Sequence, residues 1–137
     1  MKYIVDTREQ KPYKFDDFKV GTLKTGDYSV EGYKKEFAVE RKSLADFVGS
    51  VTSGRERFER EVERLQDLEF GAVIIETDLR SIWKARLYSK VSRKSIVNTA
   101  LKWTVKYGIP FVFVSNRTGG KYAVEAYAEA FVKYYEE

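Results

Sequence analysis

The stretch GDYSVEGYKKEFAVERKSLADF, residues 26–47, decides how the whole sequence is interpreted, because it begins like a β-hairpin and ends like a helix. Its β-branched and aromatic residues predict two strands, at residues 28–30 and 36–40, joined by a tight turn around Glu31 and Gly32. The second strand nevertheless ends on three consecutive charges, Glu40 to Lys42. A buried strand that ends in this way needs an explanation.

Regular patterning continues on both sides of this stretch. Apolar runs predict strands, and apolar residues at helical spacing behind capping residues predict helices. We expect further strands at residues 2–5, 18–23, 70–76 and 109–115, the last two buried on both faces, and helices at 44–51 behind Ser43, 55–68, 78–87, 92–107 and 122–135. Strands separated by helices predict an α/β fold with a mixed central β-sheet flanked by helices.

The two helices nearest the C-terminus carry the longest predicted apolar faces. For residues 92–107 we expect the inward face to consist of Ile96, Val97, Ala100, Leu101, Thr104 and Val105, with Gly108 ending the helix. For residues 122–135 we expect Ala123, Ala126, Tyr127, Ala130, Phe131 and Tyr134 to face inward. This last helix also carries more aromatic area than one buried stripe requires, so a homodimer through Tyr122, Tyr127, Phe131, Tyr134 and Tyr135 competes with a purely internal role.

The amino-acid composition limits where the protein can be located and which catalytic groups it can use. The chain has 137 residues, of which 43% are hydrophobic and 34% are charged, as expected for a single domain spanning residues 1–137. No apolar run approaches the roughly 20 residues of a membrane span, so we expect a cytoplasmic protein, in the nucleoid or, in a eukaryote, the nucleus. The sequence has no Cys and no His, which excludes disulfides, thiolate sites and the commonest zinc ligand. Catalysis would therefore depend on carboxylates, Lys, Arg, Tyr, hydroxyls or a metal bound by oxygen.

Charge is distributed unevenly along the chain. The formal net charge is only +4, yet residues 79–124 contain ten Lys and Arg and no acid. Such a segment is either a surface for a polyanion or a solvated basic face.

Strand geometry explains the three charges. Because side chains alternate between faces, Glu40 and Lys42 project to one face and Arg41 to the other. Asp27 enters the hairpin from its opposite arm, and Asp6 ends the first strand as a possible third carboxylate. Carboxylates beside a lysine suit a hard cation, Mg²⁺ or Mn²⁺, and phosphodiester hydrolysis, although an acid and a lysine on a strand can also be a simple ion pair.

Three segments together resemble a known family: VDTREQ, LKTGDYSV and VERKSLADF. They are similar to the nuclease domain of the family that includes the xeroderma pigmentosum group F repair nuclease and the eukaryotic crossover-junction endonucleases. That family has the pattern Gly-Asp, a gap, Glu-Arg-Lys, three residues, Asp, which this chain matches from Gly26 to Asp46. The stretches SVTSGRERFERE and SRKSIVNTALKWTVKYGIPFVFVSNR extend the resemblance over most of the chain.

The resemblance implies a restriction-endonuclease-like fold and a structure-selective Mg²⁺- or Mn²⁺-dependent endodeoxyribonuclease that cuts branched or flapped duplex DNA in repair or recombination. By position it implies Asp6, Asp27 and Glu40 as metal ligands, and Lys42 as the catalytic lysine. The motif also contains four supporting residues: Arg8, Glu9, Arg41 and Asp46. For Arg41 an ion pair behind the site is as good an expectation as a DNA contact, and Glu9 either bonds Arg41 or enters the site.

Residues 1–137 lack the helix-hairpin-helix pair that usually follows this domain in the family. We therefore expect DNA binding to depend on the basic segment or on a separate DNA-binding partner. Cations in the first turn of a helix oppose its dipole, and a phosphate would relieve that conflict. The residues expected to bind DNA are Arg86, Lys90, Arg93 and Lys94.

Two other functions compete with the nuclease. A noncatalytic DNA-binding or scaffolding partner could keep the fold and lose the chemistry, but the intact Asp27, Glu40 and Lys42 argue against it. A hydrolase of small phosphorylated molecules would need a Gly-rich phosphate loop, and RTGGK at residues 117–121 is a weak candidate.

Overall fold

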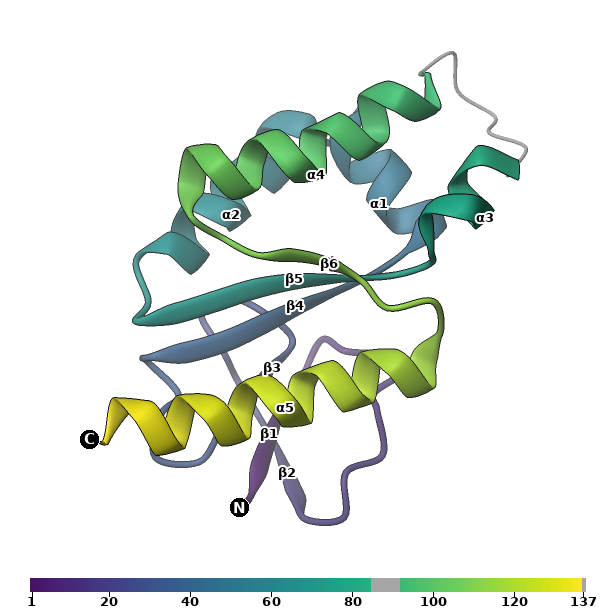
Figure 1. Ribbon diagram of the computed structural model, residues 1–137. Coiled ribbons are helices and arrows are strands. Elements are labelled where there is room, and N and C mark those ends of the chain that lie inside the picture. The colour runs from purple at the N-terminus through teal and green to yellow at the C-terminus, as the bar shows by residue number, and fades with distance from the viewer. Residues whose placement is uncertain (85–91, 137) are drawn as a thin grey trace.

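A six-stranded mixed sheet forms the middle layer of the molecule (Figure 1). The computed structural model describes residues 1–84 and 92–136. The order across the sheet is β2-β1-β3-β4-β5-β6; β3 is antiparallel to both of its neighbours, and the other neighbouring pairs are parallel. The strands are β1 (Tyr3–Asp6), β2 (Phe18–Gly21), β3 (Tyr28–Val30), β4 (Phe37–Ser43), β5 (Phe70–Glu76) and β6 (Phe111–Phe113). The predicted mixed sheet is confirmed.

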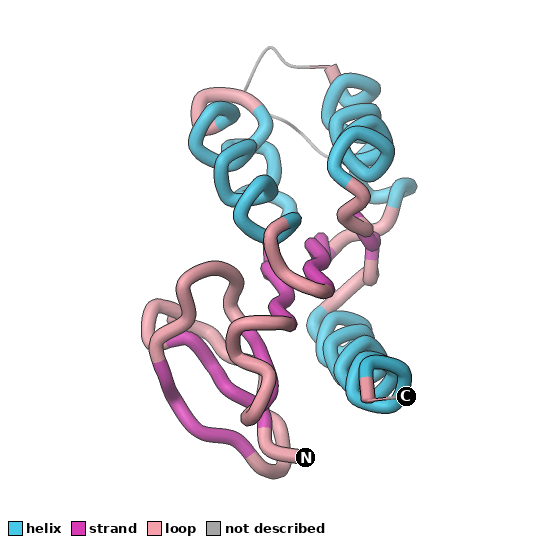
Figure 2. Tube along the Cα trace, turned by 90° about the vertical axis from the view of Figure 1, so that its left-hand side faces the viewer, coloured by secondary structure: helices cyan, strands magenta, loops and turns pink. Residues whose placement is uncertain are grey.

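Helices cover both faces of this sheet. Three helices, α1 (Leu44–Val51), α2 (Arg55–Gln66) and α4 (Arg93–Tyr107), lie on one face, and α5 (Arg117–Tyr135) lies on the other (Figures 1 and 2). The short α3 (Leu79–Lys84) follows β5. Each face has its own apolar core, one centred on Phe47, Phe58 and Trp103 and the other on Tyr28, Phe37 and Ile74. None of the helices within the described ranges is long and apolar enough to cross a membrane.

Capping residues set the helix boundaries. The Asp46 amide donates to Ser43 Oγ at 3.2 Å, and the Ser95 amide donates to Ser92 Oγ at 3.1 Å, so both predicted N-caps are confirmed. Gly108 ends α4 at φ 68°, also as predicted. Helix α5, in contrast, begins five residues earlier than expected.

The early start of α5 has a local cause. The Asn116 side chain accepts a hydrogen bond from the Gly119 amide at 2.8 Å, and so caps the helix before residue 117. RTGGK is therefore the first turn of a helix and not a phosphate loop. A Cβ at Gly120 would lie 1.9 Å from the Tyr13 hydroxyl, so this glycine lets the helix pack against Tyr13.

The predicted inward face of α4 is partly wrong. Leu101 is 57% exposed and Val105 is 86% exposed, while Trp103 and Tyr107 are buried in their place. Trp103 packs on Phe58, with ring centroids 5.8 Å apart. Because large aromatic side chains bury more area than Leu or Val, they decide the rotation of the helix.

Other elements differ from the sequence prediction at their ends. Strand β6 is half-buried at Val112 and Phe113, because it is the edge strand of the sheet and has a neighbour on one side only. The predicted inward face of α5 is partly wrong: Tyr134, Ala126 and Ala130 are exposed, whereas Gly120, Val124 and Ala128 are buried, because the helix packs closely against Tyr13 at Gly120. The end predicted for the helix at 78–87 lies outside the described residues.

The hairpin between β3 and β4 forms, but with a longer connection than predicted. Gly32 adopts φ +92°, and the Tyr33 amide donates to the Val30 carbonyl at 2.9 Å. A second turn follows, in which the Phe37 amide donates to the Tyr33 carbonyl at 3.0 Å. Strand β4 then continues to Ser43, since its residues pair in register with β5 as far as Glu76. The motif charges therefore lie within the strand rather than beyond its end.

Candidate active site

The start of β3 lies close against β4 because of one glycine. Gly26 has φ +81°, and a Cβ there would lie 2.8 Å from the Ala38 Cβ. The Asp27 amide donates to the Val39 carbonyl at 2.9 Å, and the Arg41 amide donates to Asp27 Oδ2 at 2.7 Å. The carboxylate of Asp27 is thereby fixed to the backbone of β4 beside Glu40.

Asp27 and Glu40 form a carboxyl pair. Their side chains are hydrogen-bonded to each other, and both are largely covered by protein. Burial raises the pKa of Asp27 to about 6, against the opposing hydrogen bond from the Arg41 amide. Burial also raises the pKa of Glu40 well above its usual value, and the charge of Asp27 adds to the effect. When ionised, two carboxyls held side by side in this way are a pair of hard oxygen donors for a cation.

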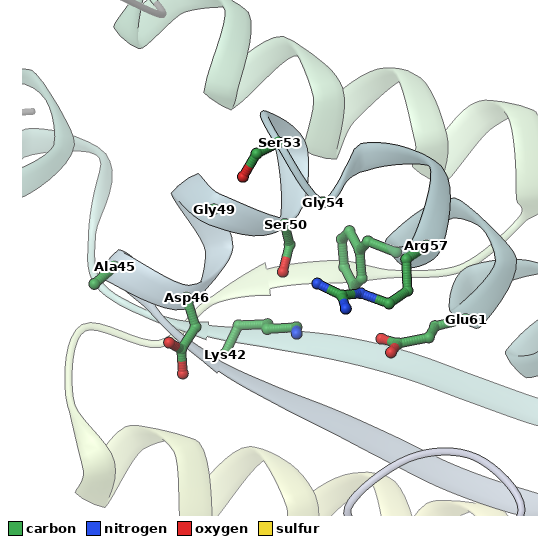
Figure 3. A pocket seen from close by; sticks show the side chains of 10 residues that line it. Lys42, Ala45, Asp46, Gly49, Ser50, Ser53, Gly54, Arg57 and Glu61 are labelled. Atoms are coloured by element: carbon green, nitrogen blue, oxygen red, sulfur yellow. The ribbon is translucent and has the colours of Figure 1, made fainter. Parts of the chain in front are cut away.

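Lys42 lies on the same side of β4 as Glu40, as strand alternation predicts. Its Nζ is 3.9 Å from Glu40 Oε1 and 5.0 Å from the centre of the Phe58 ring. Figure 3 shows the ammonium directed toward Arg57 and Glu61 of α2. The pair and the lysine thus face a common opening.

Arg41 points to the opposite face and is enclosed by acids. Its Nη2 is 2.9 Å from Glu76 Oε1, and its Nη1 is 3.4 Å from Glu9 Oε1. The Tyr13 hydroxyl donates to Glu76 Oε2 at 2.6 Å, and the Tyr28 hydroxyl donates to Glu9 Oε2 at 3.3 Å. Arg41 thus makes ion pairs with Glu76 and Glu9, and both Arg41 and Glu9 also line the cavity of about 480 Å³ that contains Asp27 and Glu40.

Asp6 differs most from its predicted role. It is 1% exposed; Oδ1 accepts from the Leu23 amide at 2.8 Å, and Oδ2 accepts from Arg8 Nε at 2.7 Å. Although burial opposes it, the bond from Arg8 holds the pKa of Asp6 below its usual value. Within residues 1–84 and 92–136, no three or more acidic side chains are grouped to hold one metal ion. The described residues thus do not group Asp6 with Asp27 and Glu40 around one site, and its role as a third metal ligand stays a prediction.

Arg8, by contrast, lies at the opening. Its guanidinium is anchored by Asp6 and donates through Nη2 to the Leu23 carbonyl at 3.0 Å, yet its side chain is 68% exposed. It lines the same cavities as Asp27 and Glu40. Asp6 thus positions the guanidinium of Arg8 next to the carboxyl pair of Asp27 and Glu40.

Three cavities meet around the pair. One of about 480 Å³ contains Asp27, Glu40 and Lys42, and one of about 180 Å³ contains Asp27, Glu40 and Glu61. The third, of about 510 Å³, extends from Lys42 over the connection between α1 and α2 (Figure 3). Asp46, in the first turn of α1, is exposed, lines two of these cavities and points away from Lys42 (Figure 3).

Sequence reasoning missed Arg57 and Glu61. Both belong to the charged face of α2, whose many acid–base pairs at helical spacing indicated solvated surface. The structure places Arg57 in the cavity beside Lys42, and the charge of Glu61 contributes to the raised pKa of Glu40. No signal in the sequence of α2 distinguishes these two positions from the other charges on the helix.

The residues expected to bind DNA lie elsewhere or are not described. Arg86 and Lys90 fall outside the described residues. Arg93 and Lys94 are exposed in the first turn of α4, and neither lines a cavity that contains Asp27 or Glu40.

Comparison with known proteins gives a family and a fold. A family model described as the ERCC4 domain matches residues 5–119. No curated protein sequence matches the chain. Among solved structures, XPF from Aeropyrum pernix is similar with a TM-score of 0.76 and 21% identity over 95% of this chain. XPF from Aeropyrum pernix in complex with DNA is similar with a TM-score of 0.75 and 21% identity over 96% of this chain.

The chain spans 61% and 65% of the length of these two structures. At this level of identity the likeness concerns the fold, and it agrees with the restriction-endonuclease-like fold expected from the sequence.

Proposed function

The chain belongs to the ERCC4-domain family, and we propose that it is a metal-dependent DNA endonuclease that hydrolyses phosphodiester bonds. One observation carries the proposal: the Asp27–Glu40 carboxyl pair lies beside Lys42 at an open, water-accessible cavity. A pair of this kind in a closed core would be structural. Here it is accessible to a substrate.

The residues present fit Mg²⁺ or Mn²⁺. Both ions prefer carboxylate oxygen, and Asp27 and Glu40 would supply it from a rigid strand pair. When bound, the ion would polarise the phosphoryl oxygen and lower the pKa of its bound water. Burial disfavours the ionised forms of both carboxyls and so raises their pKa values. A bound cation would favour the ionised forms and offset this effect.

Two cations of the chain would act on the phosphate. Lys42 would orient the attacking water or offset the negative charge that develops in the transition state. Arg8 is fixed by Asp6 at the rim of the same cavity, where it can contact a phosphate oxygen of the substrate. The enclosed Arg41 would hold β4 in register from behind, so that Glu40 and Lys42 keep their positions.

We extend the proposal to branched or flapped duplex DNA, and to phosphate contacts from Arg93 and Lys94. The resemblance noted in the sequence supports the first, and the exposed first turn of α4 supports the second. Exposure of Tyr122, Tyr134 and Tyr135 on α5 leaves area for a homodimer or a separate partner.

A cleavage panel tests the function. Purified protein would be incubated with EDTA, Mg²⁺ or Mn²⁺ and with single-stranded, duplex, flap and four-way DNA. We expect EDTA to abolish cleavage, either metal to restore it, and the flap or four-way substrates to be cut fastest. Binding without cleavage under every metal condition would favour the noncatalytic scaffold instead.

A further inference from the structure

A fourth cavity lies next to the candidate active site and takes no part in the chemistry proposed above. Its volume is about 500 Å³, and it is formed by the loop before β3, the connection between β3 and β4, and the end of α2. We name it the β3–α2 groove. It is lined by Thr22, Lys24, Lys34, Lys35, Arg64 and Leu68, together with Thr25 and Asp67.

The groove is continuous with the carboxyl pair. Lys24, Thr25 and Arg64 line it, and the same three residues line the cavity of about 180 Å³ that contains Asp27 and Glu40. A chain-like molecule that passes over the pair can therefore continue into the groove without leaving the surface.

The charges of the groove are not balanced locally. Four cations line it against one acid, Asp67. Within residues 1–84 and 92–136, none of these four cations has a carboxylate within 4.0 Å. Some exposed lysines elsewhere have such a partner, as Lys19 has Glu31 at 2.7 Å and Lys106 has Glu59 at 3.1 Å. The groove differs in grouping four cations that lack one around a single cavity. The groove therefore concentrates positive charge that a polyanion can neutralise.

Its floor is apolar. Leu68 is half-buried and packs against the core beneath α1, α2 and α4, and Thr22 and Thr25 also line the groove. A cationic rim over an apolar floor matches a sugar–phosphate backbone, in which charged phosphates alternate with less polar sugars.

We infer that the β3–α2 groove binds the backbone of the DNA strand adjacent to the phosphodiester that is cut. Phosphates contact Lys24, Lys34, Lys35 and Arg64, and sugars lie against Leu68. The inference rests on the proposed function, and it adds a second DNA contact surface to the one expected at Arg93 and Lys94.

The test measures binding and excludes cleavage. Fluorescence anisotropy of a labelled flap DNA would be recorded in EDTA over a series of salt concentrations. The groove variant would combine Lys24→Gln, Lys34→Gln and Lys35→Gln. Its matched control would combine Lys102→Gln, Lys121→Gln and Lys133→Gln, which removes the same charge from α4 and α5. Circular dichroism would verify that both variants fold.

We expect the groove variant to lose at least tenfold in affinity, with the control changed much less. Each lost phosphate contact lowers the slope of log affinity against log salt by roughly 0.9, so the slope should fall by roughly 2.7 in the groove variant. Arg64→Gln alone should lower it by roughly 0.9. This single change keeps the test usable if the triple variant does not fold.

The outcomes separate the two proposals. If the protein binds DNA through the groove but cuts it with neither metal, the nuclease proposal falls and the groove assignment stands. If the groove and control variants lose affinity equally, if neither loses any, or if the wild type binds no DNA, the groove assignment is overturned. If the groove instead binds an acidic protein, the groove variant should bind DNA as tightly as the wild type.

Discussion

On one face of β4, Arg41 is enclosed by Glu76, Glu9 and Tyr13, whereas on the other face Glu40 and Lys42 lie beside Asp27. The cavity of about 480 Å³ is lined by Arg41 and Glu9 as well as by Glu40 and Lys42. Arg41 has two carboxylate partners, at 2.9 and 3.4 Å. Among residues 1–84 and 92–136, Lys42 has one carboxylate partner, Glu40, at 3.9 Å. The pKa of Glu40 is raised by burial and by the nearby charge of Asp27. Neighbouring residues of one strand thus have opposite electrostatic surroundings.

This difference distinguishes a residue that stabilises the strand from residues that are suited to binding a metal ion. A buried cation with well-placed acids fixes the strand, and its removal leaves carboxylates without a counter-charge. The half-buried carboxyls of Asp27 and Glu40 have raised pKa values, because burial makes their ionisation unfavourable. A divalent cation would make ionisation favourable again, and raised pKa values of this kind are typical of functional sites.

The largest effect is expected on the open face. Lys42→Ala should lower the single-turnover rate of DNA cleavage by about 100- to 1,000-fold, because it removes one charge-stabilising donor from the transition state. Thermal unfolding should change little, since the lysine has no close ion pair. Lys11→Ala, at the edge of the same cavity, is the control. A normal rate in the Lys42 variant would remove this residue from the mechanism.

The enclosed face should respond in stability. Arg41→Met leaves Glu76 and Glu9 buried without their cation, so the free energy of unfolding should fall by about 3 to 5 kcal/mol in urea titrations. Lys106→Met breaks the exposed pair with Glu59, for which a loss of about 0 to 1 kcal/mol is expected. Similar losses in the two variants would contradict the distinction between the two faces.

A smaller effect concerns pH in the metal-free protein. The folded pKa of Asp27, about 6, exceeds its ordinary value of 3.8, so the folded state binds this proton more tightly than the unfolded state. Stability should therefore decrease as pH rises from about 4 through 6, by roughly 1 to 3 kcal/mol. Urea titrations in EDTA would measure the decrease, and Asp27→Asn should reduce it. Stability that rises over this range would refute the raised pKa.

Much of this site could be predicted from the sequence because it depends on local geometry. Strand alternation placed Glu40 and Lys42 together and Arg41 opposite, and the hairpin brought Asp27 to Glu40. The role of Asp6 could not be predicted, because it depends on the backbone amide of Leu23, seventeen residues away. The approach of Glu61 and Arg57 to the site also depends on tertiary packing, since each resembles any other charge on α2.

The fold shows the same limit. Caps at Ser43, Ser92 and Gly108 were readable from sequence, since each acts within one helical turn. The rotation of α4 was not, because Leu101 and Trp103 both fit an apolar face and only packing against Phe58 selects Trp103.

Manganese binding by the DNA-free protein tests the central claim most directly, namely that Asp27 and Glu40 together hold the catalytic cation. Electron paramagnetic resonance of unbound Mn²⁺ would be followed while the ion is titrated into the wild type, Asp27→Asn and Lys42→Ala. The account predicts at least tenfold weaker binding in Asp27→Asn and nearly unchanged binding in Lys42→Ala, because only the former loses a ligand. Wild-type affinity in Asp27→Asn would contradict the account.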